Sequence, residues 1–190
     1  MKCKYKIGIV LILTGILVLV GVGLVANKKN SDITKNADVI ELKLTDFKHK
    51  GEYQFCEIPW GTSLEELKTI VPYSLDEDPG RPPTTDGKAF YISSERNVLK
   101  GKGARPVYEF YNDELVGVQL VFSSAENSIE LFEPIIMELT ELFGMESEKR
   151  EIESEITRDI IYLWKTNNTS LEIVSERDTY LLIFISCTDV

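Results

Sequence analysis

Residues 159–187 read DIIYLWKTNNTSLEIVSERDTYLLIFISC, and this stretch decides the fold of the chain. Apolar residues alternate along most of it with a period of two, which is typical of β-strands. The polar pairs Asn167-Asn168 and Arg177-Asp178 interrupt this alternation and indicate turns. The stretch therefore predicts three consecutive strands, at residues 159–165, 169–175 and 179–187.

An earlier part of the chain has the same alternation. It predicts strands at residues 89–93, 106–111 and 115–122, and the turn Asn112-Asp113-Glu114 joins the last two as a hairpin. Residues 39–44 alternate weakly and indicate an edge strand.

A helix is predicted before each group of three strands. The first begins where Thr62 with Glu65, or Ser63 with Glu66, has capping-box spacing. The second covers about residues 126–143, where apolar residues follow helical spacing, and Gly144 suits its C-terminal cap. Pro134 lies inside this pattern, so the second helix is either kinked or built from two pieces.

The order of helix, three strands, helix, three strands indicates two α-β-β-β units, at about residues 55–123 and 126–187. The predicted fold class is α+β, with an N-terminal transmembrane helix followed by one domain in which helices pack on one face of an antiparallel sheet. The pattern resembles the tandem helix-plus-β-meander scaffold of the beta-lactamase-inhibitor-protein-like and BamE-like folds. The opening IPWGTSLEEL at residues 58–67 is similar to the start of many small exported bacterial domains. The resemblance implies a fold and no catalytic residues; the second unit lacks a counterpart of this opening.

The run from Ile7 to Ala26 contains no charged residue and follows a basic leader, residues 1–6. About 20 apolar residues can cross a hydrocarbon core roughly 30 Å thick, so residues 7–26 predict a transmembrane helix or uncleaved signal anchor. Residues 27–37 then form a polar tether, and residues 38–190 a domain outside the cytoplasm. The predicted location is the cell membrane, with a single pass; the alternative is secretion after signal cleavage.

Charge excludes one class of partner. Removing the three leader lysines from the 21 basic residues leaves 18 against 31 acidic ones, a formal charge of −13 that would repel a phosphate backbone. We therefore expect no nucleic-acid partner. Cys56 and Cys187 leave two alternatives, a disulfide that an oxidising exterior would permit or two buried thiols.

No catalytic, cofactor or metal motif is evident. His49 is the single histidine and lies near the tether, away from any Ser or Cys arrangement that would use it as a base. The two cysteines and His49 lack the spacing of metal ligands. We expect a protein that is not an enzyme and that binds no cofactor or metal.

The aromatic and apolar residues of the last strands say more about a binding surface. Strand alternation places Tyr162 with Trp164, and Tyr180 with Leu182 and Phe184. If these share one open sheet face, they form a surface of the kind that anchors protein interfaces. The alternative is that both faces are buried. The sequence thus predicts a non-catalytic module that binds a protein or peptide; the alternative is a small-molecule sensor or carrier domain, and an enzyme is least favoured.

Overall fold

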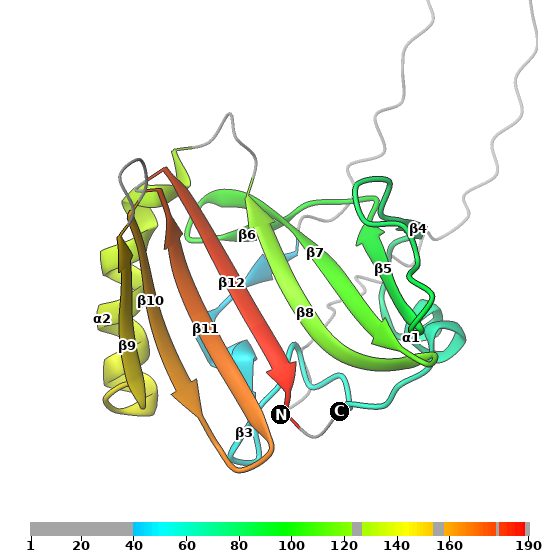
Figure 1. Cartoon of the computed structure of the whole chain (residues 1–190), viewed down its shortest axis with the longest axis horizontal. Helices are drawn as coiled ribbons and strands as arrows, with labels where there is room; N and C mark the ends of the chain where they lie inside the picture. The colour runs from blue at the N-terminus through cyan, green and yellow to red at the C-terminus, as the bar shows by residue number, and fades with distance from the viewer. Residues whose placement is uncertain (1–39, 123–126, 154–157, 178, 189–190) are drawn as a thin grey trace, which may run out of the picture. The chain divides into compact units, whose positions relative to one another are not determined.

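One large β-sheet of ten strands organises the compact unit Val39–Val190, of which the computed structural model describes residues 40–122, 127–153, 158–177 and 179–188 (Figure 1). Its strands are β1 (Glu41–Leu42), β4 (Leu75–Glu77), β5 (Lys88–Ser93), β6 (Asn97–Leu99), β7 (Lys102–Tyr111), β8 (Glu114–Phe122), β9 (Glu148–Glu153), β10 (Arg158–Lys165), β11 (Thr169–Glu176) and β12 (Tyr180–Cys187).

The strands follow the order β1-β6-β7-β8-β12-β11-β10-β9, and β5 and β4 extend the sheet from β7. The pairs are antiparallel except β1 with β6, which is parallel. β7 is long enough to carry two neighbours on one side: its residues 102–104 pair with β6 and its residues 107–111 with β5. Arg105 and Pro106 fall between these two pairings.

The helices are short. α1 (Leu64–Ile70) has the capping box of Ser63 with Glu66, one of the two predicted boxes. α2 (Phe132–Phe143) follows the 3-10 turn η2 (Ser128–Leu131), and Gly144 ends it with a positive φ of 86°. Pro134 lies in the first turn of α2, where a backbone N–H would lack a helical acceptor, so α2 begins close to the proline instead of bending at it.

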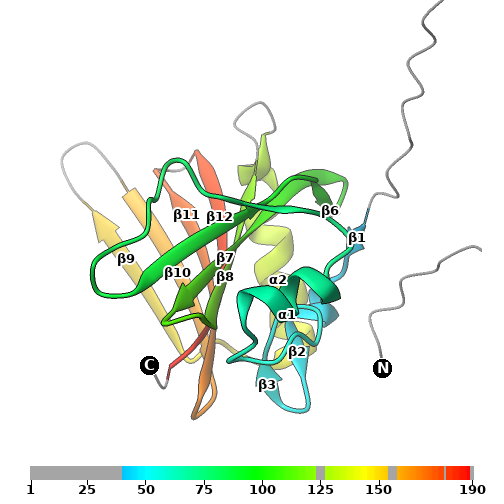
Figure 2. The ribbon, with the colours of Figure 1, turned by 90° about the vertical axis from the view of Figure 1, so that its right-hand side faces the viewer.

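The hydrophobic core lies on one face of the sheet, which we call the core face. α2, α1, the 3-10 turn η1 (Leu44–Phe47) and the small hairpin β2 (Lys48–His49) and β3 (Glu52–Tyr53) contribute to this core, and Figure 2 shows these elements on one side of the strands. Many side chains that the sheet contributes to the core are buried to 1% exposure or less, among them Tyr108, Leu120, Leu171, Ile173, Ile183 and Ile185. We call the opposite face the outer face.

All six strands that the sequence predicts within residues 89–122 and 159–187 are confirmed. The predicted fold class is nevertheless wrong, because the described residues form mainly one ten-stranded sheet with two short helices and not two α-β-β-β units. Three segments outside the predicted strands also join the sheet. Residues 75–77 form β4, residues 97–99 form β6, and the highly charged residues 148–153 form β9. Tertiary pairing here overrides weak local preference.

The first predicted unit also lacks a helix equivalent to the second. α1 has 7 residues and fully buries Leu67 alone, whereas α2 has 12 residues and buries four. A helix of two turns cannot cover a three-stranded meander, since each turn rises about 5.4 Å. The first group of strands therefore joins the second in a common sheet.

Among the helices of the described residues, none is long and apolar enough to cross a membrane. The predicted leader (residues 1–6), membrane span (7–26) and tether (27–37) all lie outside the described residues.

Candidate functional site

The outer face carries a row of apolar side chains that crosses four neighbouring strands in register. Val121 on β8 pairs with Leu182 on β12, Leu182 with Val174 on β11, and Val174 with Ile161 on β10. Paired residues in antiparallel strands point to the same face, so these four side chains lie side by side. We call Val121, Leu182, Val174 and Ile161 the apolar row.

Each residue of the apolar row is half-buried, and none belongs to the core cluster or packs against it. Phe184 and Tyr180 flank Leu182 on the same strand and the same face, and Tyr180 is 41% exposed. Three strand spacings span about 14 Å, and the four-residue rise from Tyr180 to Phe184 spans about 13 Å. The apolar patch is thus about the size that a short peptide segment or one helix face covers.

Arginines stand at both ends of the apolar row. Arg105 on β7 pairs with Val121, and Arg150 on β9 pairs with Ile161. Arg150 is neutralised locally, since its Nε lies 2.7 Å from the Glu148 Oε1 atom. Arg105 differs, because its Nε is buried and has no hydrogen-bond partner. Arg105 lies between the segments of β7 that pair with β5 and with β6.

A second row of mixed character runs beside the first. Gln119, Phe184 and Glu172 pair in register across β8, β12 and β11. One further step along the strands, the hydroxyls of Ser170 and Ser186 are 2.9 Å apart across β11 and β12. The apolar patch therefore has a polar border on this side, the arrangement of protein interfaces that have an apolar centre and a polar rim.

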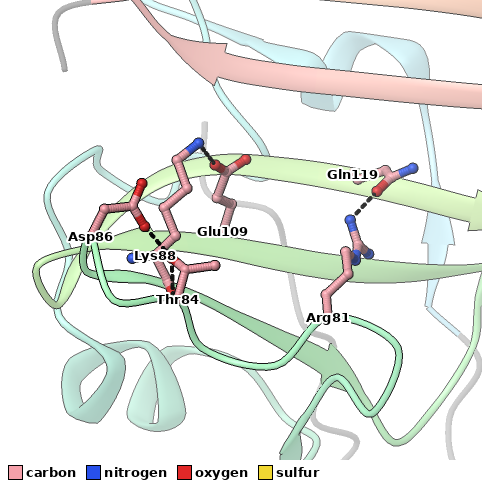
Figure 3. A network of polar contacts seen from close by, with 6 residues as sticks. All are labelled: Arg81, Thr84, Asp86, Lys88, Glu109 and Gln119. Atoms are coloured by element: carbon pink, nitrogen blue, oxygen red, sulfur yellow. Dashed lines mark hydrogen bonds and ion pairs between the residues drawn. The ribbon is translucent and has the colours of Figure 1, made fainter.

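The loop of residues 78–87 lies against the β5, β7 and β8 end of the outer face (Figure 3). Arg81 fixes it: its Nη1 donates to the Gln119 Oε1 atom at 2.7 Å, its Nε to the Asp78 Oδ2 atom at 2.8 Å, and its guanidinium lies 4.8 Å from the Phe90 ring centroid. These contacts join the loop to β5 and β8, so that it bounds the apolar patch on one side.

The base of this loop is held by paired charges. The Lys88 Nζ atom lies 3.0 Å from the Glu109 Oε1 atom, and this hydrogen bond raises the pKa of Lys88. Thr84 donates to Asp86 and thereby lowers the pKa of that carboxyl. The Lys88 backbone N–H in turn donates to the Thr84 hydroxyl at 3.1 Å. Both shifts stabilise the charged forms, so this network is suited to holding the loop in place and not to transferring protons near neutral pH.

The structure divides the five residues predicted to share a face. Tyr180, Leu182 and Phe184 lie together on the outer face, whereas Tyr162 and Trp164 lie on the core face. Trp164 is 1% exposed, and its Nε1 donates to the Gly144 carbonyl at 2.9 Å. The Tyr162 ring packs edge-on against Phe132 of α2, with 5.9 Å between ring centroids.

Pairing between β10 and β11 explains the division. Tyr162 pairs with Ile173 and Trp164 with Leu171, and both partners belong to the core. Sequence alternation assigns residues of one strand to two faces but does not relate the faces of different strands. For the same reason, the sequence did not predict Val121, Val174 and Ile161 as residues of the candidate binding face. Ile161 alternates with Tyr162 and Trp164 along β10, whereas β11 has no aromatic residue from which the face of Val174 could be judged.

The remaining predicted residues carry no site. Cys56 and Cys187, both described, are half-buried and are not joined by a disulfide. The His49 Nδ1 atom lies 3.4 Å from the Glu57 Oε1 atom. Within the described residues there is no group of three His, Cys, Asp or Glu side chains that could hold a metal ion.

A hollow of about 280 Å³ lies apart from the outer face, near β1, η1, β6 and α2. Its apolar floor comes from Leu42, Leu44, Leu99 and Leu142, and the Lys100–Glu138 ion pair lies at its border. Ligand pockets usually have volumes of about 300–1,000 Å³. This hollow is at the lower limit for a small-molecule site.

Comparisons with known proteins do not assign the chain to a family. No family model matches it, and no curated protein matches it. Among solved structures, it is similar to a DUF4309 family protein from Bacillus subtilis (TM-score 0.41, 13% identity, covering 66% of this chain and 78% of that one). It is also similar to a cysteine-rich secretory protein from Staphylococcus aureus (TM-score 0.39, 13% identity, covering 80% of this chain).

The chain spans 50% of the length of the staphylococcal protein. At these TM-scores neither likeness carries an argument about fold or function. The resemblance to beta-lactamase-inhibitor-protein-like and BamE-like folds, implied by the predicted order of helices and strands, stays a prediction.

Proposed function

We propose that the chain is a non-catalytic binding module and that its outer face receives a segment of another protein. The observation that carries the proposal is the apolar row, four half-buried aliphatic side chains in register across β8, β12, β11 and β10. Water contacts this row because the core elements lie on the opposite face. Burying it against a partner would be favourable, at about 25 cal/mol for each Å² of apolar surface removed from water.

The surroundings of the row support a protein partner over a small molecule. Phe184 and Tyr180 add aromatic area beside Leu182, and aromatic residues anchor protein interfaces more often than other types. The row lies on an open strand surface, whereas small ligands are usually enclosed in concave pockets. The hollow near α2 supports the alternative, a small-molecule sensor or carrier, less well because of its volume of about 280 Å³.

Affinity capture with matched variants of the full chain tests the proposal. We would compare wild type with Leu182→Ser, which places a polar group in the middle of the apolar row. The control is Met137→Ser, because Met137 is 65% exposed on α2, away from the outer face. Each retained protein would be purified and its affinity measured by calorimetry.

We expect a partner that binds wild type and the Met137→Ser variant equally and binds Leu182→Ser at least about tenfold more weakly, the cost of removing a central apolar anchor. Circular dichroism and thermal unfolding would verify that both variants are folded. Partners that bind wild type and Leu182→Ser with the same affinity would show that the outer face is not the binding surface.

A further inference from the structure

Arg105 is an unsatisfied donor at the edge of the proposed binding surface. Its side chain is half-buried, its Nε is fully buried, and that atom has no hydrogen-bond partner. Arginine is always charged in proteins, and its N–H groups lose hydration energy when they are buried without an acceptor. The Nη1 and Nη2 atoms of the same guanidinium are not among the buried unpaired atoms, so these two atoms are the ones that a partner could reach.

Other arginines at the outer face already have acceptors. Arg81 donates to Asp78 and Gln119, and Arg150 pairs with Glu148. Among the described residues, no salt bridge is found for Arg105. Arg105 therefore offers an unpaired positive charge at the β7 end of the apolar row, while the Glu172 carboxylate lies on the same face beside Phe184.

We propose that the bound segment places a carboxylate against Arg105 while its apolar side chains cover Val121 and Leu182. This inference rests on the proposed function and names the chemistry of the partner. A guanidinium binds a carboxylate through two parallel hydrogen bonds, a geometry that also fixes the orientation of the segment along the row. The apolar row then accounts for most of the buried area, and the contact with Arg105 fixes the position of the segment along the row.

Strand spacing sets the distance between the two features of the partner. Arg105 and Leu182 are separated by two strand spacings, about 10 Å. In an extended segment, whose side chains alternate between two faces, this corresponds to an acidic residue two or four positions from the main apolar anchor. In a helix it corresponds to about seven positions, since each residue rises 1.5 Å. The formal net charge of the chain is −10, so a segment with many acidic residues would be repelled. One or two carboxylates are expected.

A displayed library of random 16-residue peptides, selected on the immobilised full chain, provides the probe. Selected peptides would be synthesised and their dissociation constants measured with wild type and with Leu182→Ser, Arg105→Gln and Arg177→Gln. The last is the matched control, because Arg177 is exposed in the turn between β11 and β12. A charge exchange completes the set, in which Arg105→Glu is paired with a peptide whose acidic residue is replaced by lysine.

We expect selected peptides to combine apolar residues with a carboxylate, separated from the main apolar anchor by the spacing derived for an extended or a helical segment. Arg105→Gln should weaken their binding about 10- to 100-fold, the range for a hydrogen bond to a charged group, and Arg177→Gln should not change it. The charge exchange should restore at least part of the lost affinity. Peptides that lose affinity with Leu182→Ser but not with Arg105→Gln would overturn this inference and leave the proposed function standing. A selection that yields no peptide sensitive to Leu182→Ser would overturn both.

Discussion

The location of Trp164 on the core face leads to a sharp prediction for stability. Trp164→Ala would remove a side chain that is 1% exposed and delete its hydrogen bond to the Gly144 carbonyl. A tryptophan buries about 150–250 Å², which corresponds to about 4–6 kcal/mol at about 25 cal/mol for each Å². Alanine retains part of this area, and measured substitutions of this kind cost about 3–5 kcal/mol. We expect a loss in that range.

Urea denaturation measures this loss. With a slope of about 2 kcal/mol per molar urea, Trp164→Ala should lower the midpoint by about 1.5–2.5 M. Tyr180→Ala is the matched comparison, because Tyr180 is 41% exposed on the outer face and should change the free energy of unfolding by about 0.5 kcal/mol or less. Trp164→Phe should cost about 1–2 kcal/mol, since it keeps most of the ring but loses the hydrogen bond. A loss below about 1 kcal/mol for Trp164→Ala would refute the assignment of Trp164 to the core and return it to the candidate binding face.

Three further predictions concern the loop of residues 78–87 and the turn after β10. Gly87→Ala should destabilise the fold by about 1–3 kcal/mol in thermal unfolding, because Gly87 has a φ of +92° and an added Cβ would collide with the Asn112 side chain. Gly80→Ala should be close to neutral. Arg81→Ala should cost about 1–2 kcal/mol and make the amides of residues 78–87 exchange faster, since it deletes the contacts to Asp78, Gln119 and Phe90. Hydrogen bonds from Thr166 and Thr169 lower the pKa of Glu52 in the folded state, so its stabilising contribution is present above the unfolded pKa near 4.5 and is lost as pH falls through the lower folded pKa. Glu52→Gln should therefore flatten the acid side of the stability-against-pH profile, and an unchanged profile would contradict this.

Strand positions were largely predictable because alternation is a local property. Residues 115–122 and 179–187 have a half-buried and a fully buried side in the structure, as a period of two requires. The capping box at Ser63 and Glu66 was also readable, because both of its hydrogen bonds lie within one turn. These features depend on neighbours within a few residues.

Strand pairing was not predictable because it depends on distant segments. β12 pairs with β8 across about 60 residues, and this pairing brings Leu182 next to Val121. Nothing in residues 148–153, which are exposed and mostly charged, indicates a strand. Their hydrogen-bonded pairing with β10 makes them one. The candidate site could not be predicted for the same reason, since an in-register row across four strands exists only after the strands have paired.

Neither the β9 edge nor the core face of the sheet is suited to binding a partner. β9 ends the sheet, and its six residues are all exposed and mostly charged, with ion pairs such as Arg150–Glu148 and Lys149–Glu151 along it. Charged edge strands resist the addition of another strand, so a partner is not expected to extend the sheet here. The core face is filled by α2, η1 and the β2–β3 hairpin.

The outer face remains, and its composition fits reversible binding of a partner better than permanent burial. Its aliphatic side chains are half-buried between neighbours, which limits the apolar area that water contacts while no partner is bound. A patch of about 14 by 13 Å is well below the roughly 800 Å² that each side of a stable interface buries. Affinity would then depend on a few contacts at the centre and on one charge at the end of the row. Leu182 and Arg105 are the residues whose replacement separates these two contributions.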